Sequence, residues 1–165
     1  MSKNNRGLHP TRDLTKNWRK GDAEKLATME NEAEAVWPGG GGWQTDPQEL
    51  ERWIRTGDLI GAFATEDGNR IVALCTLTAK PGQKENSYVP HLICHPDYHG
   101  KKHGKSVLHA TVEYGYEAGF RKVDLHTWSG NMKAVPLYKK TGFMWQPEST
   151  VFMENFIPSA RRHPL

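Results

Sequence analysis

The sequence predicts a mixed α/β domain with a mainly antiparallel sheet, one parallel pair of strands, and helices on both faces. Two apolar runs flank Asp67 and Gly68, a pairing typical of a β-hairpin. Further along, a strand–helix–strand unit over 86–128 indicates a crossover between parallel strands. A chain of 165 residues, 36% apolar and 25% charged, fits one globular domain with one core.

The first third of the chain predicts a short strand and two helices. We expect residues 1–12 to form a frayed lead-in, a strand near 14–18, and a helix over 22–36, where helix formers dominate. The glycines at 39–42 predict a loop. The second helix, over 46–57, has an N-cap aspartate, a proline in its first turn and a terminating glycine.

The middle and end of the chain supply the remaining strands and helices. Strands are expected over 59–65, 70–80 and 86–94, the last interrupted at Pro90. A helix over 105–118 should end at Gly119, a strand should follow, and a short helix should end at Gly142. Two final strands are predicted, near 143–146 and 150–156. The domain should span 13–157, with 158–165 a tail or a truncated linker.

Composition and charge argue against a membrane protein and do not require a nucleic-acid partner. No segment is apolar enough for a bilayer span or a signal-peptide core, so a cytoplasmic protein without a membrane partner is expected. The net charge of +3 does not require a nucleic-acid partner, although it suits an anionic ligand. The two cysteines lie in apolar runs and should be reduced thiols.

A run of histidines opens the question of function. His91, His95, His99 and His103 stand four residues apart, as zinc-binding histidines do on a helix. Pro96 and Gly100 interrupt any such helix, however, and in a strand side chains four apart are more than ~10 Å from each other. We therefore expect no metal site.

The segment that follows, GKKHGKS, joins a strand to a helix. It has three residues between its glycines where a nucleotide-binding P-loop has four, and no magnesium-binding acid is evident downstream. A nucleotide phosphotransferase is therefore a weaker alternative. The glycines Gly100 and Gly104 instead let the backbone approach an anion at the helix N-terminus, and nearby lysines add positive charge.

Two motifs resemble those of the GNAT superfamily of acetyl-CoA-dependent N-acetyltransferases. The stretch ICHPDYHGKKHGKSVL is similar to that family's strand and its pyrophosphate loop, Q/R-x-x-G-x-G/A. The later NMKAVPLYKKTGF contains the family's complete N-x-x-A-x-x-L-Y-x-K-x-G-F pattern. His99 stands in place of Gln or Arg, and Lys102 replaces the first loop glycine. The resemblance covers residues 11–157.

The resemblance implies a GNAT-like fold with a splayed parallel pair of strands, and acetyl-CoA as co-substrate. The acetyl group would pass to a primary amine by direct attack in a ternary complex, with Tyr138 protonating the leaving thiolate. Implied cofactor-binding residues are the strand end Ile93, Cys94 and His95, then the loop and helix start His99, Gly100, Lys101, Lys102, His103, Gly104, Lys105 and Ser106, and finally Asn131 and Lys140.

The general base and the acceptor stay open. His91 and His126 rank first as bases because imidazole titrates near neutral pH, followed by Tyr88 and Glu85, all expected on strands that line the cleft. Tryptophans and glutamates between the first strand and the hairpin suit a cationic amine; these are Trp37, Trp43, Trp53, Glu30, Glu32 and Glu34. The acceptor is a small amine, an amino acid or a peptide N-terminus. A homodimer and a non-catalytic acyl-CoA-binding domain stay among the alternatives.

Overall fold

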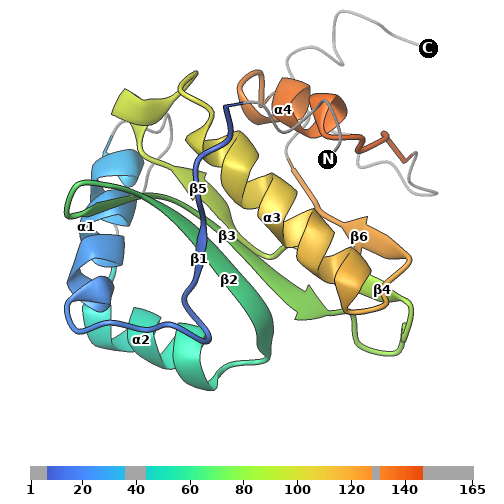
Figure 1. Cartoon of the computed structure of the whole chain (residues 1–165), viewed down its shortest axis with the longest axis horizontal. Coiled ribbons are helices and arrows are strands. Elements are labelled where there is room, and N and C mark those ends of the chain that lie inside the picture. Colours follow the sequence, from blue (N-terminus) through green and yellow to red (C-terminus); the bar gives the residue numbers. More distant parts are fainter. Residues whose placement is uncertain (1–6, 36–43, 128–130, 147–165) are drawn as a thin grey trace, which may run out of the picture.

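The computed structural model describes residues 7–35, 44–127 and 131–146, which form a central sheet flanked by helices (Figure 1). The strands are β1 (Arg12–Asp13), β2 (Leu59–Asp67), β3 (Arg70–Ala79), β4 (Asn86–Tyr88), β5 (Leu92–Cys94) and β6 (Lys122–Asp124). The helices are α1 (Asp22–Glu34), α2 (Pro47–Thr56), α3 (His103–Glu117) and α4 (Ala134–Lys140), and a 3₁₀ turn covers Pro96–Tyr98.

The sheet has the mixed topology that the sequence predicts. Its strands run in the order β1-β2-β3-β4-β6, and every pairing is antiparallel except β4 with β6. Strand β5 pairs with β3 beyond the end of β4. Helix α3 lies over the sheet as it connects β5 to β6, which is the predicted crossover (Figure 1).

Alternation along the strands divides the core in two. On one face, the apolar stripes of α1 and α2 meet the sheet through Leu26, Met29, Leu50, Ile54, Ala62, Ala64 and Leu74. On the other face, Ala73, Cys75 and Leu77 of the sheet meet Val107 and Leu108 of α3, and α4 packs against the same cluster. Because β3 is buried on both faces, it is apolar along most of its length. Helices therefore cover both faces, as expected.

The first strand lies two residues earlier than predicted. Arg12 and Asp13 pair with Ala64 and Phe63, whereas residues 14–17 form a turn. The carboxylate of Asp13 accepts hydrogen bonds from the backbone N–H of Thr15 at 3.1 Å and of Ala62 at 3.2 Å. This local bond from an aspartate side chain turns the chain away from the sheet, so the prediction of a strand near 14–18 is wrong.

The helix boundaries follow the signals in the sequence. Asp46 caps α2 by accepting the N–H of Gln48 at 2.9 Å, and Gly57 ends that helix. Gly142 follows α4 with a φ of 95°, a left-handed conformation that favours glycine.

The strand predicted at 86–94 is broken at Pro90, as expected, into β4 and β5. The strand predicted at 143–146 is not formed; the N–H of Phe143 instead donates to the carbonyl of Tyr138 at 3.0 Å, closing the end of α4. The strand predicted at 150–156 lies outside the described residues, as do Trp37 and Trp43. Among the described helices, none combines the length and hydropathy needed to span a bilayer.

Candidate functional site

The sheet opens where the parallel pair ends. The N–H of Val89 donates to the carbonyl of Asp124 at 2.8 Å. Beyond this bond, β5 pairs with β3 and not with β6 in the described part of the chain. Pro90 has no N–H to continue the ladder, so the break follows from the sequence. The edge of β5 that faces away from β3 is thus separated from β6.

Alternate residues of β5 direct their backbone groups to opposite sides. His91 and His95 face β3, because the His91 carbonyl accepts from Thr76 at 2.9 Å and the His95 N–H donates to Val72 at 2.8 Å. Leu92 and Cys94 therefore face the opening. Of the three strand-end residues expected to bind the cofactor, His95 uses its N–H on β3, and Ile93 faces β3 as well because it alternates with Leu92 and Cys94. Leu92 was missed, because the sequence does not fix which residues of a broken strand face its neighbour.

Helix α3 begins beside this edge without a side-chain cap. Its N-cap is Lys102, whose side chain makes no capping hydrogen bond, and the N–H of Gly104 in the first turn bonds the thiol of Cys94. A methyl group at Gly104 would lie 3.7 Å from Cys94 and from Leu137, which places the helix start between β5 and α4. The uncapped turn and the helix dipole together favour an anion.

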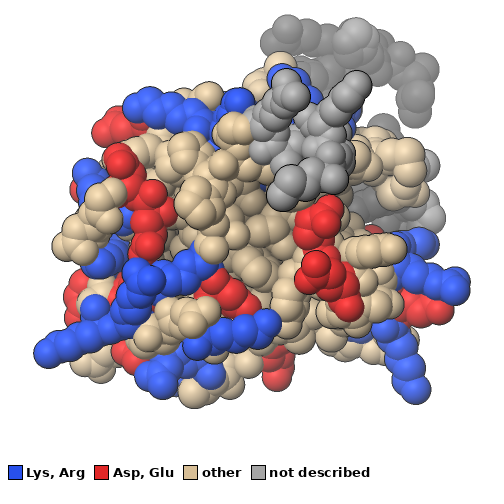
Figure 2. All heavy atoms as spheres, viewed as in Figure 1, with Lys and Arg blue, Asp and Glu red and all other residues tan. Residues whose placement is uncertain are grey.

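The loop before α3 adopts the backbone that its glycine pattern suggests, with one exception. Gly100 has a φ of 76°, and Lys102 has a φ of 71°, the one positive value for a non-glycine residue in the described chain. The lysine therefore holds a conformation that suits the glycine of the family pattern. Lysine and arginine side chains lie along the upper margin of the face in Figure 2, near the loop that precedes α3. Lys101 and Lys102 are exposed, and Lys105 is half-buried.

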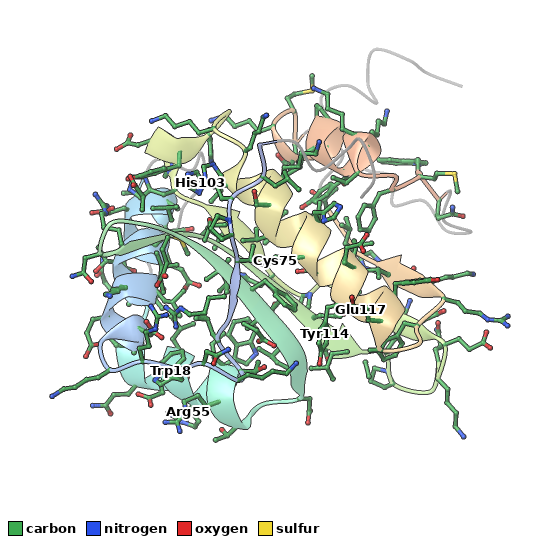
Figure 3. The ribbon with its side chains drawn as sticks, in the orientation of Figure 1. Trp18, Arg55, Cys75, His103, Tyr114 and Glu117 are labelled. Carbon is green, nitrogen blue, oxygen red and sulfur yellow. The ribbon has the colours of Figure 1, made fainter. Side chains whose placement is uncertain are left out.

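Several side chains predicted to bind the cofactor are engaged within the protein. The imidazole of His103 is buried and bonds Thr65 at 3.0 Å; in Figure 3 it lies at the start of α3. Ser106 donates to the carbonyl of Lys102 at 2.8 Å. His99 donates from Nε2 to the carbonyl of Cys94 at 3.0 Å and so ties the loop to the strand end.

Residues 7–11 cover part of this loop, although the sequence suggested a frayed lead-in. The N–H of His9 donates to the hydroxyl of Ser106 at 2.9 Å, and its ring donates to the carbonyl of Lys101 at 2.8 Å. The ring also stacks on His103 with centroids 3.7 Å apart. Burial first, and then the charge of His9, hold the pKa of His103 below its usual value.

Helix α4 brings Tyr138 to the same side of the sheet as α3. Its ring packs on the core of that face and lies edge-on to Phe143 with centroids 5.9 Å apart. Burial raises the pKa of Tyr138 to about 12. Asn131 caps α4 by accepting the N–H of Ala134 at 3.0 Å, and Lys140 is exposed at the other end of the helix.

The other face of the sheet holds two imidazole–carboxylate pairs. His91 Nε2 lies 3.1 Å from Glu30, and His95 Nε2 lies 2.6 Å from Glu32. Both glutamates come from α1, where we expected only solvated acids or attraction of a cation. The four histidines of the opening run thus have separate partners, and the described residues contain no group of side chains placed to hold a metal ion.

The remaining base candidates lie elsewhere. His126 is exposed and its Nδ1 lies 3.2 Å from the hydroxyl of Tyr88. Glu85 precedes β4, at the end of the parallel pair remote from the opening, and lies 3.6 Å from Arg121. The expectation that Glu85 lines the cleft is therefore wrong.

The hollows of the described surface do not mark this site. One of about 470 Å³ is lined by residues of the β1 region, among them Arg12, Asn17 and Trp18. Another of about 220 Å³ lies between α1 and the start of β3. The strand opening and the helix start lie apart from both hollows.

Comparison with known proteins agrees with this arrangement. The acetyltransferase (GNAT) family model matches residues 26–143. An uncharacterized N-acetyltransferase of Methanocaldococcus jannaschii is 25% identical over 96 residues, which cover 56% of this chain and 42% of that relative. The match therefore spans less than half of the relative's length.

Acetyltransferases are among the solved structures with this fold. An aminoglycoside acetyltransferase from an uncultured soil metagenomic sample, in complex with sisomicin, has a TM-score of 0.67 and 17% identity; the alignment covers 89% of this chain and 95% of that one. AAC(6')-Iy, in complex with the bisubstrate analogue CoA-S-monomethyl-acetylneamine, has a TM-score of 0.66 and 13% identity, with 89% and 98% covered. The family match over most of the chain, on this sheet and loop, shows that the protein belongs to the GNAT family of acetyltransferases.

Proposed function

We propose that the protein is an N-acetyltransferase that moves the acetyl group of acetyl-CoA to a primary amine. The observation that carries this proposal is the position of the uncapped start of α3 beside the open edge of β5, with α4 packed next to both. One continuous surface thus offers amides for a diphosphate, a strand edge for pantetheine, and Tyr138 near the thioester.

The first turn of α3 would hold the diphosphate. The backbone N–H groups of His103 and Lys105 would supply the donors there, whereas the N–H of Gly104 already bonds the Cys94 thiol, and the ammonium groups of Lys101 and Lys105 add charge. The backbone groups of Leu92 and the N–H of Cys94 would bond the amides of pantetheine as a neighbouring strand would, while the Cys94 carbonyl stays with His99.

Tyr138 would donate a proton or a hydrogen bond to the leaving sulfur. With a pKa of about 12 its phenol is protonated at neutral pH. Because a thiol has an ordinary pKa near ~8.5, full transfer to the thiolate is uphill in this environment. A hydrogen bond that stabilises the developing thiolate is therefore the main contribution that we assign to this residue.

The described thiols favour direct attack over an acyl-enzyme. Burial raises the pKa of Cys94 to about 11 and that of Cys75 to about 12. Both are protonated at neutral pH and are poor nucleophiles. The acceptor amine would then attack the thioester itself, in a ternary complex, after losing its own proton to a base. We assign that base to His91, because its imidazole is held by the carboxylate of Glu30, whereas that of His126 is exposed and faces the hydroxyl of Tyr88.

The acceptor class proposed here is a small molecule with one or more primary amines. The metagenomic structural neighbour is an aminoglycoside acetyltransferase, which supports testing aminoglycosides first. Trp53, which lies edge-on to His91 with centroids 5.7 Å apart, supplies an aromatic wall for a cationic group on this face. Amino acids and peptide N-termini complete the panel.

Amine-dependent release of free thiol from acetyl-CoA tests the proposal directly. We expect Tyr138→Phe to lower kcat by roughly 100-fold, within the range of one acid–base contribution, and to leave the acetyl-CoA Kd nearly unchanged. Tyr116→Phe, on an exposed tyrosine of α3, is the matched control and should keep full activity. Full kcat in Tyr138→Phe would remove the role of the phenol. Binding of acetyl-CoA without turnover on any amine would favour a non-catalytic acyl-CoA-binding domain.

A further inference from the structure

We propose that Glu30 is the positioning residue of the general base, and that Nδ1 of His91 is the atom that takes the proton from the acceptor amine. This inference rests on the proposed function. It concerns two residues that are 61 positions apart in the sequence and that meet on the face of the sheet covered by α1 and α2.

The pairing fixes the tautomer of His91. Its Nε2 lies 3.1 Å from Oε1 of Glu30, and a carboxylate can only accept a hydrogen bond. The ring proton is therefore on Nε2, which leaves the lone pair of a neutral imidazole on Nδ1. A histidine that is oriented by a carboxylate in this way, with its second nitrogen available, is the arrangement that a general base requires.

Glu30 is itself held in place. Its side chain is 14% exposed, and its second oxygen accepts the hydroxyl of Thr45 at 3.1 Å. The N–H of Thr45 donates to the side chain of Asn31 at 2.8 Å, which ties the segment before α2 to the end of α1. The edge-on ring of Trp53 restrains the imidazole plane. Contacts from two helices therefore determine the direction of the His91 ring.

The neighbouring pair, His95 and Glu32, provides a comparison, because its imidazole has a structural role. His95 also bonds a glutamate of α1, but its Nδ1 accepts the N–H of Asp97 at 3.2 Å, so both ring nitrogens are used. Its side chain is 7% exposed, whereas that of His91 is 34% exposed. Of the two, only His91 combines a fixed tautomer with solvent access, and the break at Pro90 places it at the opening.

The proton transfer balances without a further reactant. The protonated acceptor amine gives one proton to Nδ1 of His91, and the imidazolium that forms is stabilised by the carboxylate of Glu30. The free amine then attacks the thioester carbon and the carbon–sulfur bond breaks. The second proton that the attacking nitrogen loses goes to the thiolate, so that coenzyme A leaves as the thiol. His91 afterwards returns its proton to solvent.

A double-mutant cycle separates this role from a merely structural one. Glu30→Ala and His91→Ala should each lower kcat, the former by about 10- to 100-fold and the latter by at least as much, since a general base contributes ~10²–10⁴-fold. The double variant should be no slower than His91→Ala, because Glu30 acts through His91. If the losses of kcat in the two single variants multiplied in the double variant, the proposal would be overturned.

Two further measurements keep the test independent of activity and folding. Nitrogen NMR of the histidine rings should show the Nε2–H form of His91 in the wild type and a mixture of tautomers in Glu30→Ala. Glu32→Ala is the matched control, expected to leave the His91 spectrum unchanged because it removes the carboxylate from the other pair. Calorimetry with acetyl-CoA should give the same Kd for all variants, which shows that they are folded.

The outcomes distinguish the two proposals. A wild-type protein that turns over, with Glu30→Ala at the same rate or with the same His91 tautomer, would overturn this inference alone. No turnover of any amine by the wild type would overturn the proposed function and this inference together. Recovery of His91→Ala activity by added imidazole would support a proton-transfer role for the missing ring.

Discussion

At the scale of single residues, Lys102 shows a conflict between local conformation and side chain. It adopts a φ of 71°, in the region that costs an ordinary residue roughly 1–2 kcal/mol. The family motif has glycine at this position, so the conformation belongs to the loop and the lysine departs from the pattern. We expect its ammonium to favour anion binding near the helix start, at a cost in stability.

Lys102→Gly should therefore stabilise the protein and weaken its cofactor binding. We expect the free energy of unfolding in urea to rise by about 1 kcal/mol, because glycine adopts this φ without strain. Lys102→Ala removes the same ammonium but keeps a Cβ, so it should weaken acetyl-CoA binding without the gain in stability. Equal stability of the two variants would show that the backbone is not strained here.

At the scale of elements, the N-terminal segment and α3 form one unit around two stacked imidazoles. Besides His9 and His103 themselves, Lys101, Asp67 and the edge-on ring of Tyr98 face this pair. The segment crosses the loop that is proposed to bind the diphosphate. The contacts of the N-terminal segment with α3 should therefore help to hold the conformation of that loop.

The lowered pKa of His103 predicts a loss of stability in mild acid. The unfolded chain takes up a proton near the ordinary imidazole pKa of ~6.5, and the folded one only at lower pH. Stability should thus be full above ~6.5 and fall until the folded pKa is passed. Urea unfolding at pH 8 and pH 5.5 measures this loss.

Two variants identify the group that causes the loss of stability in mild acid. His103→Asn should reduce the pH-dependent loss, since the buried titrating ring is gone. His9→Ala should reduce it in part, because one charge that opposes protonation is removed, while costing about 1 kcal/mol at pH 8 for the lost hydrogen bond from its ring to the carbonyl of Lys101. A loss of wild-type size in both variants would assign the effect to other groups.

At the scale of the whole molecule, the two faces of the sheet carry different parts of the proposed reaction. The helix start, Tyr138 and the lysines belong to the face of α3 and α4, whereas His91 and Glu30 belong to the face of α1 and α2. The opening between β5 and β6 joins the two faces. The thioester would have to lie within that opening to meet both groups.

Cofactor binding should for this reason stabilise the entire fold. At about 100 times its Kd, acetyl-CoA should add ~2.7 kcal/mol to the free energy of unfolding and raise Tm accordingly. Lys105→Glu should diminish this gain, because it places a negative charge in the first turn of α3. Lys20→Glu makes the same charge change in an exposed loop before α1 and should keep it. An equal gain in both variants would exclude the start of α3 as the diphosphate site.

The sequence by itself determined the local features of this protein. Asp46, Gly57 and Gly142 bound their helices, Pro90 breaks its strand, and the motif around Tyr138 identifies the family, because each acts on backbone conformation or pattern within a few residues. The short first strand was misplaced, because its pairing with β2 lies far away in the sequence and the Asp13 side chain turns the chain just after it.

Tertiary structure alone decided which residues of β5 face the opening and which glutamate meets which histidine. Because Pro90 interrupts the strand, the alternation of residues before it does not tell which residues of β5 face the opening. The pairing of Glu30 with His91 depends on how α1 packs across the sheet. Such contacts join distant segments whose relative positions follow from burial of the whole core rather than from any local preference.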